Sequence, residues 1–348
     1  MIIEWNSDPL CEAQQKAAPK VLDGKAIANA RLEQLGELAG QFTDLKIQPT
    51  LAVVQVGGDP ASSIYIRHKV RACEKVGIIG EHHHLPADVR YEEILGLLKR
   101  LNRDRRVHGI LLQLPLPEGM DGAEALLNIE PVKDVDGFHP VNLGNLMAGR
   151  SLLEPCTPTG ILTMLQTAEI VFKGKEAVVV GRSVIVGRPM ALMLTRANAT
   201  VTLCHRHTAD LEKAVRRSDI LVVATGVAEL IPGAWIKDGA VVIDVGISRK
   251  DGRLVGDVEF DAAKQRASFI TPVPGGVGPM TVATLMENTI RATCIQEGYV
   301  VRKGRVILAA EADLRFETTR GLGVTLLCPG ASEDRSRALP NISEREKL

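Results

Sequence analysis

The second half of the chain alternates short apolar runs with glycine turns and helical segments, and this alternation restricts the fold more than any other feature. The sequence predicts a helix over 189–197 and, around it, buried strands over 177–180, 200–204, 220–224 and 240–245. Strands that are apolar on both faces and alternate with helices are typical of a parallel sheet covered on both sides. We therefore expect an α/β fold with a Rossmann-like parallel sheet in this half.

The turn after the first of these strands reads Gly-Arg-Ser-Val-Ile-Val-Gly-Arg-Pro. In a strand-turn-helix unit, such a turn can bind the pyrophosphate of a dinucleotide on backbone N–H groups at the helix N-terminus. Its glycines stand at positions 181 and 187, with Ser183 where a middle glycine is usual and one residue more than G-x-G-x-x-G allows. The motif is weak by itself, and its place between a strand and a helix strengthens it.

The end of the second strand indicates which dinucleotide is bound. NAD-specific units carry an acidic residue there for the ribose 2′-OH, but this chain reads Cys204-His-Arg-His-Thr. Arg206 and Arg182 are available to a 2′-phosphate, so NADP is favoured over NAD. The competing interpretation of Arg206 is an exposed loop residue that binds nothing.

The first half of the chain predicts a second α/β unit, with a strand over 51–56 and helices over 24–40, 59–77 and 91–103. The helix over 59–77 has clear boundaries, because Asp59 can accept hydrogen bonds from the first backbone N–H groups, Pro60 suits the first helical position and Gly77 suits a left-handed cap.

Lys69 lies at the centre of the apolar face of this helix, where lysine is rarely found without a partner. At about 100° per residue, Ser62 and Tyr65 share its face. Either the side chain extends to water along its aliphatic stem, or desolvation favours the neutral amine and suits it to proton transfer. The residues alone leave both interpretations open. The apolar face also holds Ala61, Ala72, Cys73 and Val76, and the opposite face holds Arg67, Arg71, Glu74 and Lys75.

Two further segments bring polar groups to candidate positions. Gln113 follows an apolar strand near its carboxyl end, where parallel sheets bind their ligands, although a core amide fits equally well. Asp134 and Asp136 lie in the turn-rich segment Lys-Asp-Val-Asp-Gly-Phe, and a turn explains Asp and Gly without any function. Their spacing does not match a calcium loop.

Composition excludes several classes of protein. The 348 residues suggest about two domains. Aromatic residues make up 3% of the chain, and 42 basic residues balance 42 acidic ones, which disfavours a nucleic-acid-binding surface. No apolar run approaches the roughly 18 residues that a membrane span needs. Residues 82–84 are three histidines, but an extended backbone points neighbours to opposite faces, so we expect no metal site.

The cysteines and the N-terminus indicate the compartment. The six cysteines have no CxxC pair and no histidine at zinc-ligand spacing, so they are interpreted as reduced thiols. The first residues lack the basic and apolar regions of a secretory signal and the arginines of a mitochondrial one. We expect a cytoplasmic protein. The cysteines are Cys11, Cys73, Cys156, Cys204, Cys294 and Cys328.

Near the C-terminal end, the segment over 271–281 holds three prolines and three glycines, which predicts a stiff loop able to line a cleft. A helix over 281–297 follows it. A shorter helix over 160–168 comes after the Cys-Thr-Pro-Thr segment, our candidate domain boundary. Residues 1–20 are expected to be a poorly ordered lead-in and residues 301–348 a disordered tail.

Five motifs occur together and in the order of one family: YIRHK, GILLQLPLP, KDVDGF, GRSVIVGRP and PVPGGVGPMT. The chain resembles the bifunctional methylenetetrahydrofolate dehydrogenase/methenyltetrahydrofolate cyclohydrolase family, over roughly residues 20–297. The resemblance implies NADP-dependent oxidation of methylenetetrahydrofolate to methenyltetrahydrofolate, then hydrolysis to 10-formyltetrahydrofolate, in one-carbon metabolism. It also implies a homodimer.

The resemblance further implies two domains with a folate cleft between them: 21–158 plus 281–300 for folate, and 159–280 for NADP. It makes Lys69 the catalytic lysine, places Tyr65 against the pterin, and has Gln113 position Lys69 while Asp136 holds the pterin ring. Ser62 matches the catalytic pattern as well. The expected folate contacts also include Leu114, Pro274, Gly275, Gly276, Val277, Gly278, Pro279, Met280, Thr281 and Val282. The expected NADP contacts are Gly181, Arg182, Ser183, Val186, Gly187, Arg206, Thr225, Gly226 and Ile247.

One residue departs from the family pattern, because the position after Cys-His usually holds serine and here holds Arg206. Three other functions compete with the expected one. They are a dehydrogenase without cyclohydrolase activity, a catalytically silent folate- or nucleotide-binding module, and an oxidoreductase for another small substrate.

Overall fold

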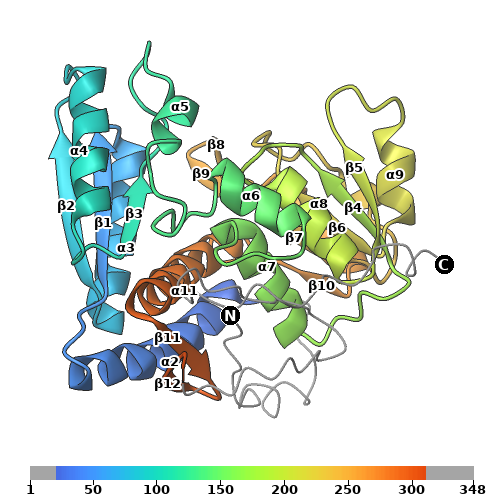
Figure 1. Ribbon diagram of the computed structural model, residues 1–348. Helices are drawn as coiled ribbons and strands as arrows, with labels where there is room; N and C mark the ends of the chain where they lie inside the picture. Colours follow the sequence, from blue (N-terminus) through green and yellow to red (C-terminus); the bar gives the residue numbers. More distant parts are fainter. Residues whose placement is uncertain (1–20, 311–348) are drawn as a thin grey trace, which may run out of the picture.

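The computed structural model describes residues 21–310, so the expectations for residues 1–20 and 311–348 lie outside the described residues. Two parallel sheets lie on opposite sides of a group of helices (Figure 1). This arrangement confirms the expected α/β fold. Within residues 21–310, no helix is both long enough and apolar enough to cross a membrane.

The first sheet has three parallel strands in the order β2-β1-β3. They are β1 (Thr50–Val56), β2 (Ile79–Leu85) and β3 (Gly109–Leu112). The central strand β1 is buried along its whole length, because Val54 packs on one side against α4 (Tyr91–Arg103) and Val53 packs on the other side against the core that contains α2 and α11. Burial on both faces explains why this strand is continuously apolar.

Helix α3 (Pro60–Val76) has the predicted boundaries. Gly77 follows it with φ = +81°, a left-handed conformation that suits glycine at a helix end. Ala72, Cys73 and Val76 are buried, whereas the four charged residues of the opposite face, Arg67, Arg71, Glu74 and Lys75, are exposed. The predicted faces are confirmed for these residues, although Tyr65 of the apolar face is 38% exposed and the side chain of Ala61 lies outside the described part of the structure.

The second sheet has five parallel strands in the order β10-β7-β6-β4-β5. Because β5 and β6 lie on opposite sides of β4, the winding direction reverses there, and such a reversal places a ligand crevice at the carboxyl ends of β4 and β6. The four predicted strands agree to within one residue at each end. The strands are β4 (Glu176–Val180), β5 (Thr200–Cys204), β6 (Ile220–Val223), β7 (Val241–Asp244) and β10 (Phe269–Ile270), and the covering helices are α8 (Gly187–Arg196), α9 (Leu211–Arg217) and α10 (Phe260–Arg266).

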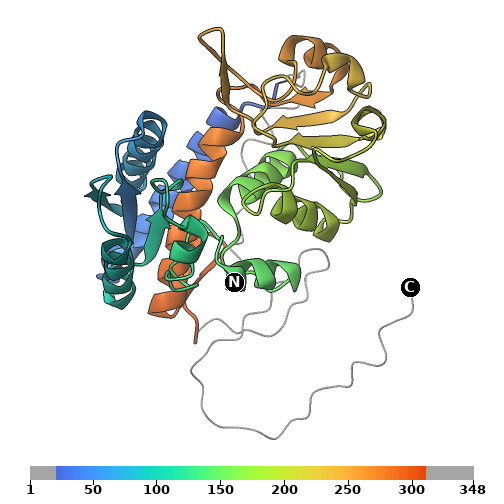
Figure 2. The same cartoon turned by 90° about the horizontal axis from the view of Figure 1, so that it is seen from above.

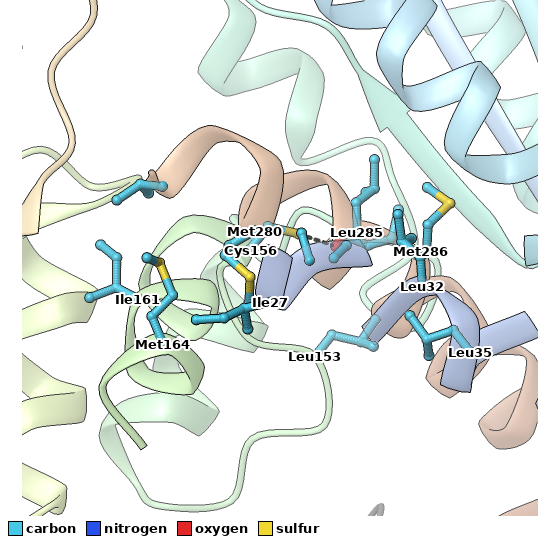
Figure 3. Close-up of a cluster of buried hydrophobic side chains, with 14 of the residues drawn as sticks. Ile27, Leu32, Leu35, Leu153, Cys156, Ile161, Met164, Met280, Leu285 and Met286 are labelled. Atoms are coloured by element: carbon cyan, nitrogen blue, oxygen red, sulfur yellow. Dashed lines mark hydrogen bonds between the residues drawn. The ribbon is translucent and has the colours of Figure 1, made fainter. Parts of the chain in front are cut away.

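Two long helices, α2 (Gly24–Asp44) and α11 (Val277–Glu297), run beside each other between the two sheets (Figure 2). With α7 (Cys156–Thr167) they enclose an apolar core that includes Leu35 and Met164 (Figure 3). The start of α2 touches the loop before α11: a Cβ on Gly24 would lie 1.9 Å from the carbonyl oxygen of Gly276. Only glycine permits this approach.

The predicted starts of two helices were wrong. α11 begins at Val277 rather than at residue 281, and α7 begins at Cys156 rather than at residue 160. In each helix the proline that suggested a loop, Pro279 or Pro158, is the third residue. An N–H in the first turn has no partner within the helix, so proline costs little there. The candidate domain boundary therefore lies within the first turn of α7.

The expected disorder from residue 301 was wrong for residues 301–310. A hairpin of β11 (Tyr299–Arg302) and β12 (Arg305–Leu308) follows α11. The Gln41 side chain of α2 holds it: Nε2 donates to Gly304 O at 3.0 Å, and Oε1 accepts from Val306 N at 2.9 Å. The mixed charges of this segment hid a hairpin that depends on a helix some 260 residues earlier.

Several short elements were not predicted, because their sequences are too short for a periodic pattern. α9, α10 and β10 belong to this group. The others are α5 (Gly122–Leu126), α6 (Pro140–Met147), the 3-10 helix η1 (Gly233–Trp235), β8 (Ser248–Lys250) and β9 (Arg253–Val255).

A buried ionic cluster joins α2 to α11. Glu287 accepts from Arg31 Nη2 at 3.0 Å and from Arg291 Nη2 at 2.5 Å, and its side chain is 4% exposed. Burial alone would raise the pKa of Glu287, but the two guanidinium groups outweigh that effect and lower it to about 2. The carboxylate therefore stays charged over the whole physiological range.

We predict that Glu287→Gln lowers the free energy of unfolding by about 3–5 kcal/mol, because it removes the buried carboxylate charge that two partly buried guanidinium groups share. Urea denaturation monitored by circular dichroism measures this loss. Glu212→Gln is the matched control, since Glu212 pairs with Arg216 at the same i,i+4 spacing but on the surface, and its loss should stay below about 1 kcal/mol. Equal losses would contradict the account.

The same carboxylate predicts an acid-dependent loss of stability. A pKa held at about 2, below the ordinary 4.5, means that the contribution of Glu287 is complete above pH 4.5 and disappears as the pH falls from there toward 2. The Glu287→Gln variant should lack this part of the acid destabilisation.

Candidate active site

The amine of Lys69 is held by an amide from the first sheet. Lys69 Nζ donates to Gln113 Oε1 at 3.1 Å, and Gln113 Nε2 donates to Leu114 O at 2.8 Å. The second bond fixes the orientation of the amide, so its oxygen faces the amine. Gln113 follows β3 directly, and its N–H donates to Val54 O at 2.9 Å. The predicted position of Gln113 at the carboxyl end of the strand is confirmed, and Lys69 is partly buried beside it.

Asp136 brings a carboxylate to the same place. Burial raises the pKa of Asp136 to about 6, while the positive charge of Lys69 opposes this rise and the charge of Asp134 adds to it. The other carboxylate of the segment, Asp134, has a structural role: its Oδ2 accepts from His139 N at 2.7 Å and from Asn142 Nδ2 at 2.9 Å. The two aspartates of KDVDGF thus divide into one that fixes the turn and one beside Lys69.

Two residues that the sequence did not single out support this carboxylate. Cys156 Sγ donates to Val135 O at 3.2 Å, and burial raises the pKa of its thiol well above the ordinary value. Asn288 of α11, buried in the protein interior, donates through Nδ2 to Val135 O at 2.8 Å and to Glu154 O at 2.9 Å. The asparagine itself was a weak signal, because asparagine is a poor helix former inside a long helix.

Tyr65 lies one helical turn before Lys69 and remains 38% exposed. Its partial burial raises the pKa of the phenol, so the ring is an uncharged, accessible surface next to the amine. Ser62 lies in the first turn of α3. Leu114 follows Gln113 and contacts the cluster that includes α4.

The segment over 274–282 divides into a loop and the first turns of α11. Gly275 has φ = +104°, and its carbonyl oxygen accepts from Lys25 N at 3.0 Å. Thr281 Oγ1 lies 3.0 Å from Thr157 Oγ1 of α7. Val277 and Met280 belong to the apolar core, at 5% and 1% exposure. Their side chains are covered by protein, so only the backbone of these two residues is left for a ligand contact.

The turn from Gly181 to Gly187 has the compactness that a dinucleotide site needs. Gly181 has φ = +116°, and a Cβ there would lie 2.1 Å from Ala224 O, while a Cβ on Gly187 would lie 1.9 Å from Gly181 O. Ser183 Oγ accepts from Val186 N at 3.1 Å and from Gly187 N at 3.3 Å. The serine that replaces the usual middle glycine therefore folds the longer turn into the start of α8.

The other expected cofactor residues also lie at the carboxyl edge of the second sheet. Gly181 N donates to Cys204 O at 2.9 Å, which joins the turn with Arg182 to the loop with Arg206. Both arginines are exposed, and Arg206 Nε donates to His207 Nε2 at 3.1 Å. Thr225 and Gly226 follow β6, and Ile247 follows β7 with 43% of its surface exposed.

Histidines 82–84 are in strand β2 as expected. His82 and His84 stack on one face with ring centroids 5.7 Å apart, and His83 contacts Glu81. Among residues 21–310, no group of three histidine, cysteine, aspartate or glutamate side chains is placed to hold a metal ion. The four cysteines in this range, Cys73, Cys156, Cys204 and Cys294, are buried free thiols.

Comparison with known proteins agrees with this geometry. Residues 22–136 match the catalytic domain of the tetrahydrofolate dehydrogenase/cyclohydrolase family, and residues 155–297 match its NAD(P)-binding domain. The bifunctional protein FolD of Magnetococcus marinus is 53% identical over 272 residues, which are 78% of this chain and 95% of the relative.

Two solved structures are similar over the same part of the chain. The bifunctional enzyme FolD of Campylobacter jejuni has 46% identity and a TM-score of 0.76, with 78% of this chain and 98% of that chain covered. FolD of Trypanosoma brucei, complexed with NADP cofactor and inhibitor, has 40% identity and a TM-score of 0.75, with 78% and 96% covered. The resemblance noted in the sequence is confirmed: the chain belongs to the tetrahydrofolate dehydrogenase/cyclohydrolase family.

Proposed function

We propose that this protein oxidises 5,10-methylenetetrahydrofolate to 5,10-methenyltetrahydrofolate with NADP and then hydrolyses the product to 10-formyltetrahydrofolate, in one-carbon metabolism. The observation that carries the proposal is the Lys69–Gln113 hydrogen bond of 3.1 Å with Asp136 beside it. An amine, an amide and a carboxylate from three separate segments meet there. The other reactant, a dinucleotide, would bind at the carboxyl ends of the strands of the second sheet.

The residues at that edge fit NADP. Neither Gly181 nor Gly187 has room for a side chain, so backbone N–H groups at the start of α8 can approach a pyrophosphate. Arg182 and Arg206 offer positive charge for a 2′-phosphate, and the loop after β5 carries no acid before Asp210. NADP, when bound, accepts a hydride from the methylene carbon of the folate. The remaining chemistry falls to side chains of the protein.

The charge that develops on the folate during the reaction indicates the roles of Lys69, Asp136 and Tyr65. Hydride loss makes the methenyl carbon electrophilic. Water adds to this carbon and loses a proton, and the bond from the carbon to N5 then breaks, which leaves the formyl group on N10. Lys69 takes part in this proton transfer, and the bond to Gln113 Oε1 keeps its nitrogen in place. Asp136 accepts hydrogen bonds from the pterin N–H groups, and Tyr65 packs against the ring.

We propose the division into a folate domain over 21–158 plus 281–300 and an NADP domain over 159–280. We also propose that the protein acts in the cytoplasm as a homodimer. Exposed apolar side chains on α6 and on α8, which packs against it, support self-association: Met147 is 77% exposed, Val141 50% and Leu192 36%. Sedimentation velocity would separate a dimer from a monomer.

We predict that Lys69→Met abolishes hydrolysis of supplied methenyltetrahydrofolate, with a loss of about 100-fold or more, because methionine keeps the length of the side chain and removes the amine. Loss of the methenyl absorbance measures this activity. Lys75→Met, on the exposed face of the same helix, is the control and should hydrolyse at the wild-type rate. Full activity in Lys69→Met would refute the assignment.

The wild-type protein in the coupled assay decides between the proposed function and its alternatives. With methylenetetrahydrofolate and NADP, we expect NADPH to form without accumulation of methenyltetrahydrofolate. Accumulation would identify a dehydrogenase without cyclohydrolase activity, and no NADPH would indicate a silent binding module or another substrate.

The raised pKa of Asp136 predicts that folate binding depends on pH. Since its pKa is about 6, the carboxylate is protonated as the pH falls through 6 and loses an acceptor for the pterin. The KM for methylenetetrahydrofolate should therefore rise below pH 6, while the KM for NADP stays constant. Steady-state kinetics between pH 5 and pH 8 test this, and Asp136→Asn should have a high KM at every pH. A wild-type KM that does not change with pH would contradict the role.

The proposed contact of Arg206 with the 2′-phosphate predicts that this residue sets the preference for NADP over NAD. A charge-assisted contact to the 2′-phosphate is worth about 1.5–3 kcal/mol, so Arg206→Ala should lower the ratio of kcat/KM for NADP to kcat/KM for NAD about tenfold or more. Arg216→Ala on α9 removes an arginine that bonds Glu212 instead and should leave the ratio unchanged. An unaltered ratio in Arg206→Ala would show that this arginine does not recognise the phosphate.

A further inference from the structure

Two buried carboxyl groups, Asp244 and Asp257, lie against the loops after β6 and β7, which are expected to contact the cofactor. They have no part in the reaction described above. They are 3% and 0% exposed. Asp244 is the last residue of β7, and Asp257 lies in the segment between β9 and α10. Buried carboxyl groups are costly unless they are hydrogen-bonded, so their contacts indicate what they hold.

Asp257 holds the loop after β6. Its Oδ2 accepts from Thr225 N at 2.6 Å, from Thr225 Oγ1 at 2.9 Å and from Gly226 N at 2.9 Å. Three donors from two adjacent residues therefore converge on one oxygen. These are the two residues of that loop expected to contact NADP.

Asp244 holds Asp257 and the loop after β7. Its Oδ1 accepts from Gly246 N at 3.0 Å and from Asp257 N at 2.9 Å, and its Oδ2 accepts from Val258 N at 2.9 Å. Gly246 directly precedes Ile247, the third expected cofactor contact at this edge. Asp244 thus links the loop after β7 to the segment that positions the loop after β6.

The same aspartate is joined to the segment that leads into the folate loop, which is residues 274–276 before α11. Asp244 N donates to Thr271 Oγ1 at 2.8 Å, and Thr271 opens the segment that leads through the folate loop to α11. Hydrogen bonds therefore connect Thr271, three residues before the folate loop, through Asp244 and Asp257 to the loop after β6.

Close packing leaves this arrangement little freedom. A Cβ on Gly246 would lie 2.0 Å from Asp257 Oδ1, and a Cβ on Gly256 would lie 2.0 Å from Asp244 Oδ2. Each carboxyl group lies directly against a glycine backbone. Asp257 Oδ1 itself has no hydrogen-bond partner, so all hydrogen bonds of this carboxyl group go through Oδ2 to the loop after β6.

We propose that Asp257, held in place by Asp244, is a positioning residue for hydride transfer: it fixes the backbone of Thr225 and Gly226 at the distance from the folate loop that brings the nicotinamide to the methylene carbon. The proposal rests on the proposed function. It differs from a general stabilising role, because the hydrolysis at Lys69 needs no nicotinamide and should not depend on this contact.

The test compares Asp257→Ala, which removes the acceptor, with Asp257→Asn, which keeps one carbonyl oxygen for the three donors. We expect Asp257→Ala to raise both the Kd for NADP, measured by calorimetry, and the KM for NADP about tenfold or more, for the loss of about 1.4 kcal/mol or more of hydrogen bonding. Its rate of hydrolysis of supplied methenyltetrahydrofolate should fall far less than its dehydrogenase activity. Asp257→Asn should lie nearer to the wild type in all three measurements.

Asp219→Ala is the control. Asp219 also accepts from a backbone N–H of this sheet, Glu176 N at 2.9 Å, but at the opposite edge, so its Kd and KM for NADP should equal those of the wild type. A parallel fall of both activities in Asp257→Ala, or an unchanged Kd for NADP, would overturn the proposal. If the proposed function itself were wrong, the wild-type protein would fail: it would bind NADP without oxidising the folate, or it would not bind NADP. That result differs from a failure seen only in the Asp257 variants.

Discussion

The hydrogen bond between Lys69 and Gln113 is the interaction on which the rest of the site depends. It joins a helix and a strand end of the first sheet, and it turns a long, flexible cation toward the protein interior. A lysine ammonium is a strongly hydrated point charge, so its inward position requires a fixed acceptor. Gln113 provides that acceptor because its own N–H₂ group is occupied by Leu114 O. The nitrogen of Lys69 thereby gains a defined place relative to Asp136.

Contacts between distant segments of the chain hold the surroundings of this bond in place. α11 contributes Asn288 to the loop that carries Asp136, and Glu287, the preceding residue, ties α11 to α2 through Arg31. The same helix begins at the folate loop, against which Gly24 of α2 packs. A single long helix thus connects the ionic cluster, the carboxylate loop and the folate loop. Changes in any one of these contacts should reach the site through α11.

Local sequence patterns predicted most of the regular structure. The helix from Pro60 to Val76, the main strands and the inward face of Lys69 follow from periodicity and end residues, which depend on near neighbours, whereas the order of the strands in each sheet does not. The turn after β4 was also recognised, but the capping role of Ser183 was not, because it depends on the three-dimensional path of the turn. The early starts of α7 and α11 were missed because proline was interpreted as a loop signal rather than as a residue of the first helical turn.

The residues that the sequence did not reveal act through contacts between segments far apart in the chain. Asn288 and Cys156 meet Val135 only after folding. Asp244 lies in a predicted strand and contacts Asp257 from 13 residues away, which no local pattern reveals. The hairpin after α11 was missed for the same reason, because Gln41 of the distant helix α2 holds it. A crystal structure of this protein with an unreactive folate analogue bridged between N5 and N10 tests the central claim most directly. The account predicts Lys69 Nζ within hydrogen-bonding distance of both Gln113 Oε1 and the bridge, with Asp136 on the pterin. An analogue bound away from Lys69, or a Lys69 side chain pointing into bulk water, would contradict it.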